Sequence, residues 1–293
     1  MTATTGYLRP QTIDELLWAL SAVGAGAKIL AGGTDLMLAV RAGRAFETLI
    51  NVSRIEALQE IALVDGQLSI GAGVTVARLL RSAEVRQAAP LLWQAADRFA
   101  SPLVRSRATV GGNLCNASPA ADLALALLAS DAEVTLASRG GPRTLSVEEF
   151  ILGPGKTALS PGEALLGVRV PARGRERFCR FEKSGSRPAL EISVAAVAVA
   201  LDFDGDAVVE PRLAYGAVAP TPLRGRGAEA AIAGRALSPS VIDDAVRAAV
   251  AEIRPIDDVR ASALYRRRLV AALVRRCLLD AASARTRFRD VAG

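Results

Sequence analysis

Two glycine pairs place the strongest constraint on how this chain folds. The first lies in LAGGTDLM, residues 30–37, and the second in TVGGNLCNASPAAD, residues 109–122. Paired glycines at the end of a strand indicate that the backbone bends sharply or that a bulky group lies against it. Small residues surround both pairs, and an aspartate follows each. Two such sites in one chain favour a single shared ligand.

The first stretch offers consecutive backbone N–H groups beside the Thr34 hydroxyl, a concavity that accepts phosphate oxygens. Alone, it is more typical of an ordinary tight turn in an α/β protein, and it is neither a P-loop nor a GxGxxG motif. In the second stretch Asn113, Asn116 and Ser118 alternate with small residues. Such a segment packs poorly on itself but suits a flat, phosphate-bearing ligand. We therefore expect two strand-to-turn cradles around the diphosphate of a dinucleotide.

The chain has no histidine, and its three cysteines, Cys115, Cys179 and Cys277, are far apart. Zinc sites need Cys and His ligands at short spacing, iron–sulfur clusters need about four thiolates, and Ser–His or Cys–His pairs need imidazole. We therefore expect no metal site and no catalytic side chain in this chain. Disulfides are not expected either, and neither a leader pattern nor a membrane-spanning run is present, which favours a cytoplasmic protein.

The net charge of +6 permits nucleic-acid binding but does not favour it. The densest basic runs, residues 173–177 and 265–269, contain too few aromatic side chains for a base-stacking surface. A solvated basic face, or a docking surface for an acidic partner, is the favoured interpretation. With 51% apolar and 23% charged residues, the chain is expected to be folded and globular.

Helices and strands are expected to alternate in the first part of the chain. Thr12 and a glycine stop predict a helix over residues 12–23. Strands are expected within residues 27–33, 48–55, 67–76 and 133–138, two helices on either side of Pro90, and a helix whose start is set by Ser118 and Pro119. Glycines and prolines then predict a domain boundary at residues 172–178.

The last part of the chain has a different pattern. Strands are expected within residues 177–185, 192–206 and 208–222, with a hairpin turn at DFDGDA, and helices within 228–234, 239–253 and 262–285. A small antiparallel sheet covered by helices is the natural packing for such a series.

Five segments together carry a family resemblance. They are KILAGGTDLM, RATVGGNLCNASPAAD, FEKSGSRPALEISVAAVAVAL, LAYGAVAPTPLR and ASALYRRRL, and the similarity around them covers the chain from about residue 5 to residue 285. In this order and spacing they resemble the FAD-binding medium subunits of the molybdenum hydroxylases. That family includes bacterial xanthine dehydrogenases, aerobic carbon monoxide dehydrogenases and enzymes acting on aldehydes, N-heterocycles and aryl-CoA thioesters.

The resemblance implies an α+β protein of two domains. Residues 1–175 would form an FAD-binding domain of the PCMH or vanillyl-alcohol-oxidase type, built from two α/β subdomains. Residues 176–293 would form a C-terminal α+β domain with a three-stranded antiparallel sheet and helices. FAD would lie extended between them.

The resemblance also assigns the cofactor site. Two cradles would hold the diphosphate through backbone N–H groups, the first formed by Lys28, Ile29, Leu30, Ala31, Gly32, Gly33, Thr34 and Asp35 and the second by Thr109, Val110, Gly111, Gly112 and Asn113. Asp122 would bind the polyol or diphosphate, Phe99 and Leu165 would line the pocket, and Lys183 would reach across from the C-terminal domain. Taken by themselves, Asp122 could be a helix N-terminal charge, Phe99 and Leu165 core residues, and Lys183 a surface lysine.

Partners follow from the same resemblance. A small subunit would carry two [2Fe-2S] clusters and a large subunit the molybdenum cofactor, assembled as a dimer of heterotrimers, with electrons passing through FAD to NAD⁺, quinone or dioxygen. Two alternatives stay open: a self-contained flavoprotein oxidoreductase of the same fold, and a binding protein for a nucleotide or an anionic polymer. Thr34 and Asp35 stand where carbon monoxide dehydrogenase medium subunits tend to carry His and Ser. At these two positions the chain looks more like the xanthine dehydrogenase and thioester reductase members of the family.

Overall fold

The computed structural model describes residues 6–172, 177–185 and 192–292, with side chains up to residue 285. The chain divides into two compact units. The first contains residues 1–88, 100–118 and 131–172, and the second contains residues 89–99, 119–130 and 173–293. The second unit therefore includes two segments from the first half of the sequence. The predicted domain boundary at residue 175 lies outside the described residues, so it stays a prediction.

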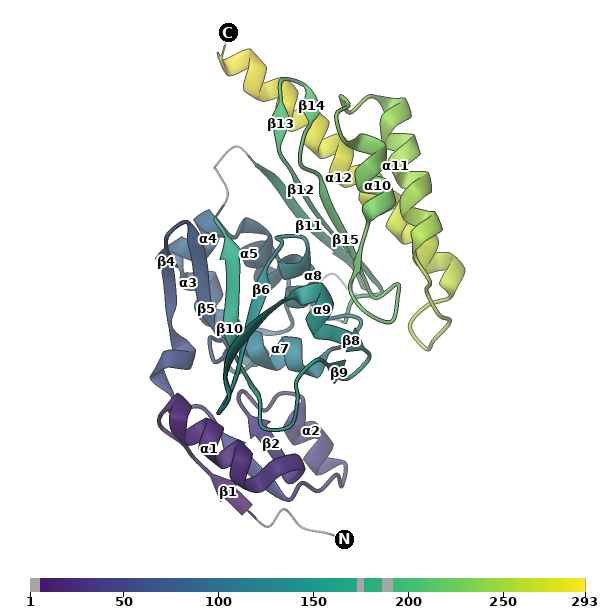
Figure 1. The fold of residues 1–293 in the computed structure, drawn as a ribbon. Helices are drawn as coiled ribbons and strands as arrows, with labels where there is room; N and C mark the ends of the chain where they lie inside the picture. The colour runs from purple at the N-terminus through teal and green to yellow at the C-terminus, as the bar shows by residue number, and fades with distance from the viewer. Residues whose placement is uncertain (1–5, 173–176, 186–191, 293) are drawn as a thin grey trace. The chain divides into compact units, whose positions relative to one another are not determined.

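The first unit contains two main sheets (Figure 1). Its strands are β1 (Gly6–Leu8), β2 (Ala27–Leu30), β3 (Thr48–Asn51), β4 (Ile61–Val64), β5 (Gln67–Gly71), β6 (Glu133–Ser138), β7 (Gly141–Ser146), β8 (Ile151–Gly153), β9 (Lys156–Thr157) and β10 (Ala164–Pro171). Its α-helices are α1 (Ile13–Val23), α2 (Leu36–Arg41), α3 (Val76–Arg81), α4 (Ala83–Ala88), α6 (Pro102–Arg105), α7 (Val110–Asn116) and α9 (Val147–Phe150), with 3₁₀ turns at Gly24–Gly26 and Glu56–Gln59.

The N-terminal sheet is parallel, in the order β1-β3-β2. Helix α1 packs on it through Leu16 and Leu20, which join a buried cluster with Ile50 of β3. The predicted start and stop of α1 are confirmed, because Thr12 accepts from the N–H of Glu15 and Gly24 follows the helix with a φ of 68°. Strand β2 ends directly before the first glycine pair, at the carboxyl edge of this sheet, where parallel sheets commonly bind ligands.

The second sheet of the first unit has five antiparallel strands in the order β4-β5-β10-β6-β7. The expected strands at residues 67–76 and 133–138 are thus confirmed as β5 and β6. The helical segment around Pro90 is different from the prediction, because it contains three helices rather than two. Ser82 separates α3 from α4: its backbone is extended, and its hydroxyl accepts from the N–H of Val85 at 3.1 Å.

The second unit consists of a four-stranded sheet with helices. Its strands are β11 (Phe178–Ser184), β12 (Ala195–Leu201), β13 (Phe203–Asp204), β14 (Ala207–Val208), β15 (Arg212–Gly216) and β16 (Leu223–Arg224), and its helices are α5 (Pro90–Asp97), α8 (Asp122–Leu128), α10 (Arg226–Ile232), α11 (Pro239–Glu252) and α12 (Ala263–Ala292). The antiparallel order is β11-β12-β15-β16. The expected sheet of three strands therefore gains a short fourth strand, β16. The hairpin turn at DFDGDA is confirmed between β13 and β14.

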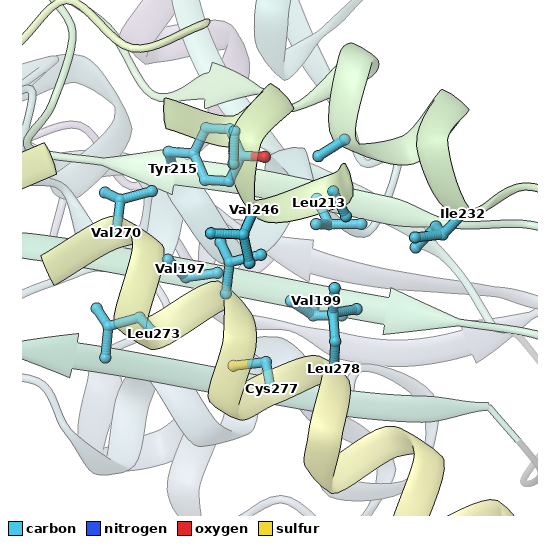
Figure 2. Close-up of a cluster of buried hydrophobic side chains, with 14 of the residues drawn as sticks. Val197, Val199, Leu213, Tyr215, Ile232, Val246, Val270, Leu273, Cys277 and Leu278 are labelled. Carbon is cyan, nitrogen blue, oxygen red and sulfur yellow. The ribbon is translucent and has the colours of Figure 1, made fainter. Parts of the chain in front are cut away.

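The central strand of this sheet, β12, is buried on both faces. Figure 2 shows the larger side chains of one face: Val197 and Val199 of β12 and Leu213 and Tyr215 of β15 pack with Ile232 of α10, Val246 of α11 and Val270, Leu273, Cys277 and Leu278 of α12. The other face carries small residues, including Ala196 and Gly216, and a Cβ placed on Gly216 would lie 2.9 Å from Leu125 of α8. The sequence AAVAVAL of β12 therefore alternates between large residues, which face α10, α11 and α12, and small residues, which face α8.

Helix α8 begins at Asp122, with Ala121 as its N-cap, so the prediction that Ser118 and Pro119 set its start is wrong. Pro119 instead uses its carbonyl to accept from the N–H of Ala217, next to β15. Of the helices that the structure describes, none combines the length and the apolar character that a membrane crossing requires.

Candidate functional site

The first glycine pair forms a tight turn with free backbone donors. Gly33 has a φ of +76°, a conformation that strongly favours glycine. The N–H groups of Gly32, Gly33 and Thr34 donate to no acceptor in the part of the chain that is described. Such a row of unused donors fits the phosphate oxygens of a dinucleotide. The turn between β2 and α2 thus offers backbone donors where the sequence predicted the first cradle, and the cradle stays a prediction.

The second glycine stretch is a helix rather than the expected strand-to-turn cradle. Thr109 is the N-cap of α7, and its hydroxyl accepts from the N–H of Gly112 at 3.0 Å. The N–H groups of Val110 and Gly111 donate to Val74 and Ala72, and that of Asn113 donates to Thr109. Because these backbone donors are occupied, the stretch can approach a ligand mainly through its bare surface at Gly112 and through side chains.

The two glycine stretches meet within the first unit. A Cβ on Gly32 would lie 1.9 Å from the carbonyl oxygen of Arg107, which is two residues before Thr109, the N-cap of α7. Farther along, the Asn116 amide donates to Asp35 Oδ1 at 3.2 Å, and the Thr34 hydroxyl donates to Asp35 Oδ2 at 3.2 Å. Segments that are far apart in sequence therefore form one continuous surface.

Two of the glycines are required by the protein itself. Gly32 allows the close crossing over Arg107, and a Cβ on Gly111 would lie 2.7 Å from the Ala72 side chain and 2.8 Å from its carbonyl oxygen. Side chains at either position would push backbone apart. The glycines at positions 32 and 111 are therefore explained by internal packing, without a ligand.

Asp122 and Lys183 form a buried ion pair in the second unit. Lys183 Nζ lies 2.6 Å from Asp122 Oδ2, and the Ser193 hydroxyl donates to Asp122 Oδ1 at 2.7 Å. Burial raises the pKa of the Asp122 carboxyl, while the Lys183 ammonium and the Ser193 hydroxyl oppose that rise. The interpretation of Lys183 as a solvated surface lysine is therefore wrong. Asp122 lies in the first turn of α8, but it also binds the side chains of Lys183 and Ser193.

The remaining two predicted site residues lie in different units. Phe99 follows α5 in the second unit and is half-buried. Leu165 lies on β10 in the first unit, is 5% exposed and pairs with Leu136 of β6 next to a β-bulge. This burial agrees with the interpretation of Leu165 as a core residue.

The cysteines are free and poorly suited to chemistry. Burial raises the pKa of Cys115 and of Cys277 to about 12, and that of Cys179 to about 11. A thiol with such a pKa stays protonated and unreactive near neutral pH. Within the described residues, no three His, Cys, Asp or Glu side chains gather as a metal site would require.

Sequence reasoning omitted two residues that organise these clusters. Asn116 was noted as a polar residue of the second stretch but not as part of the site, and its link to Asp35 depends on α7 being helical. Ser193 precedes β12 and reaches Asp122, which lies 71 positions earlier. No local spacing signals such a contact.

Comparisons with known proteins agree on one family. Residues 3–173 match the family model described as the FAD binding domain in molybdopterin dehydrogenase, and residues 180–281 match the CO dehydrogenase flavoprotein C-terminal domain. The carbon monoxide dehydrogenase medium chain of Hydrogenophaga pseudoflava is 33% identical, over 93% of this chain and 95% of its own. The xanthine dehydrogenase FAD-binding subunit of Escherichia coli O157:H7 is 30% identical, over 88% of this chain and 89% of its own.

A solved structure extends this agreement to the fold. Carbon monoxide dehydrogenase from Hydrogenophaga pseudoflava, in a form lacking the Mo-pyranopterin moiety of the molybdenum cofactor, superposes with a TM-score of 0.93 and 32% identity, covering 97% of this chain and 99% of the other. The two family models together span most of the sequence, and so does each of the relatives. The chain therefore belongs to the FAD-binding medium subunits of the molybdenum hydroxylases, and it is an oxidoreductase subunit that binds FAD.

Proposed function

We propose that this chain carries electrons, through its FAD, from the iron–sulfur clusters of a partner subunit to NAD⁺, quinone or dioxygen. Bound FAD supplies the ability to exchange electrons singly with one partner and in pairs with another. The chain's own residues bind and orient the cofactor. The observation that carries this proposal is the first glycine turn, whose free N–H groups match a diphosphate in a family of FAD-binding subunits.

The proposed cofactor site keeps the residues expected from the sequence. Lys28 to Asp35 supply the main diphosphate cradle, and Thr109 to Asn113 supply the adjoining bare surface. Phe99, Leu165, Asp122 and Lys183 complete the site, with the ion pair between Asp122 and Lys183 holding both charges in fixed positions. The PCMH-type name for the first domain, and domains divided at residue 175, belong to this proposal as well.

We also propose the assembly that the family resemblance implies. This chain would join a small iron–sulfur subunit and a large molybdenum subunit in the cytoplasm, as a dimer of heterotrimers, and would not hydroxylate a substrate without them. The H. pseudoflava relative is named as a medium chain, which supports a multi-subunit complex. Its identity of 33%, against 30% for the xanthine dehydrogenase subunit, does not decide the substrate. Genes for both partners are expected beside this one.

The cofactor assignment is tested by Gly33→Ala. Alanine at a φ of +76° strains the backbone, and its Cβ would lie 3.1 Å from Met37 Cγ, so the N–H groups of the turn should move out of line. We expect the Kd for FAD to rise about tenfold or more, because each misplaced charged hydrogen bond costs about 1.5 to 3 kcal/mol. Fluorescence titration of the deflavinated chain with FAD measures this change.

The matched control is Gly66→Ala. Gly66 also has a positive φ, of +71°, with open space around it, but it lies in the turn between β4 and β5. It should carry similar strain and retain FAD. Equal FAD affinity in both variants and the unchanged chain would refute the cradle. A colourless wild-type protein would favour the binding-protein alternative, and turnover of a substrate without partners would favour the self-contained flavoprotein.

A further inference from the structure

The loop between α11 and α12 and the first turn of α12 expose a group of large apolar side chains. Ile256 is 70% exposed, Val259 101%, Leu264 60% and Tyr265 50%. Single exposed apolar residues are ordinary, but four within ten successive positions favour a binding surface. We name residues 256–265 the apolar loop patch. It includes the start of the basic run YRRRL, to which the FAD site assigns no role.

The patch is held by hydrogen bonds within the loop. Asp258 Oδ1 accepts from the N–H groups of Arg260 and Ala261 at 2.9 and 3.1 Å. Asp257 Oδ1 accepts from the N–H of Ala263 at 2.6 Å and so caps the first turn of α12. These bonds fix the loop locally although the side chains of Ile256 and Val259 point into solvent.

Arg266 ties the same loop to the sheet. Its side chain is buried, and it donates to Asp258 Oδ1 at 2.7 Å, to the Val194 carbonyl at 2.7 Å and to the Ala217 carbonyl at 2.8 Å. The N–H of Arg254 also donates to the Val218 carbonyl. A preformed surface loses little conformational entropy on binding, so this rigidity favours recognition of another molecule.

The charges around the patch are mostly positive. Arg254 and Arg268 flank the patch in the sequence, and Arg260 lies within it, 3.3 Å from Asp258 Oδ2. All three arginines are exposed, and so is the Asp257 carboxylate. An apolar centre with a polar, charged rim is the usual layout of a protein–protein interface. Arginines at the rim attract a surface rich in carboxylates and discourage a basic one.

We propose that the apolar loop patch docks a partner subunit of the hydroxylase complex through an apolar area bordered by Asp and Glu side chains. This inference rests on the heteromeric assembly proposed above. A second copy of this chain fits less well, because the rim and the whole chain, with a net charge of +6, are both basic.

The test uses the full chain co-expressed with the proposed small and large subunits. Val259→Asp adds a charge to a side chain that is fully exposed, so folding and FAD content should not change. We expect the Kd for the partner subunits to rise at least about tenfold, as for an interface hot spot. Leu152→Asp is the matched control, because Leu152 is 64% exposed on β8 of the first unit.

A second variant tests the acidic character of the partner. Arg268→Glu should slow association with the partner subunits and reverse the effect of added salt, with little change in dissociation. Association rates measured at low and high ionic strength give this result. An unchanged rate and salt dependence would contradict the carboxylate-rich partner.

The outcomes separate the two proposals. If Val259→Asp assembles as tightly as the wild type, or if Leu152→Asp weakens assembly equally, the docking surface is wrong while the assembly stands. If the wild type binds FAD but never joins the partners, the proposed assembly fails and the docking surface fails with it. Wild-type dimers that Val259→Asp dissociates, or binding to phosphatidylserine vesicles that it abolishes, would overturn the proposal in favour of self-association or a membrane.

Discussion

At Asp122 each carboxylate oxygen has its own buried partner. One oxygen receives the Lys183 ammonium at 2.6 Å, and the other receives the Ser193 hydroxyl at 2.7 Å. Breaking a buried pair is costly because the remaining charge is left without compensation. This arrangement connects α8, β11 and the segment before β12, so a residue proposed to contact FAD also holds its own unit together.

Removal of either charge should therefore destabilise the apoprotein. We expect Lys183→Met and Asp122→Asn each to lower the free energy of unfolding by about 3 kcal/mol, and the double variant to lose less than the sum. Urea unfolding of the apoprotein measures these changes. If Lys183 also contacts the cofactor, the Kd for FAD of the folded Lys183→Met variant should rise as well. A variant with full stability would show that the ion pair is weak.

At the scale of elements, β11 is an edge strand whose open side is covered by a side chain. Gln94 of α5 donates from Nε2 to the Cys179 carbonyl at 3.0 Å, and its Oε1 accepts from the Phe181 N–H at 2.7 Å. The amide thus imitates a neighbouring strand. Exposed edge groups otherwise invite pairing with another chain.

Gln94→Ala should leave one backbone donor and one acceptor of β11 unpaired. We expect a loss of about 2 kcal/mol in unfolding free energy, within the range for unsatisfied buried groups, and faster hydrogen exchange at the Phe181 amide. Asp97→Ala, an exposed change on the same helix, is the control and should leave both unchanged. Unaltered exchange at Phe181 in Gln94→Ala would mean that the amide contributes nothing to the edge.

The sequence predicted most elements but not all their partners. Helix α1 has a capping threonine and a glycine stop, and both are local signals that the structure confirms. A sheet covered by helices was also predicted, yet the helices on the small-residue face of β12 come from residues 90–97 and 122–128, far earlier in the chain. Glycine disfavours helices, so α7 was missed: the Thr109 cap and packing against Ala72 override that propensity.

The candidate site was predictable to a similar degree. The donors at Gly32 and Gly33 follow from a local motif, whereas the pairing of Lys183 with Asp122 joins positions 61 apart and depends on tertiary structure. That the backbone donors of the second stretch are occupied could not be foreseen either, because it follows from the helical conformation of α7.

At the scale of the whole molecule, several carboxyl groups are stabilised in their charged form. Hydrogen bonds lower the pKa of Glu84, Glu149 and Glu163, and bonds led by the Arg260 N–H lower the pKa of Asp258 to about 2. A carboxyl group with a lowered pKa in the folded state contributes stability above its unfolded pKa and loses that contribution as pH falls. Together these groups should make the chain sensitive to acid.

We expect the unfolding free energy of the wild type to fall as pH decreases from about 4 to about 2, the interval between the unfolded and folded pKa of Asp258. Asp258→Asn should be less stable at neutral pH and should show a smaller fall in that interval. Denaturant titrations at a series of pH values measure both. Parallel pH profiles for the two proteins would exclude a contribution from Asp258.

The second unit is discontinuous in the sequence, which limits where this protein can be truncated. Residues 89–99 and 119–130 supply α5 and α8 to a sheet whose strands begin at residue 178. A truncation that starts after residue 172 would strip the alanine-rich face of β12 of its cover and leave β11 with a bare edge. We expect such a fragment to aggregate rather than to fold independently. A circularly permuted protein would have to keep both α5 and α8.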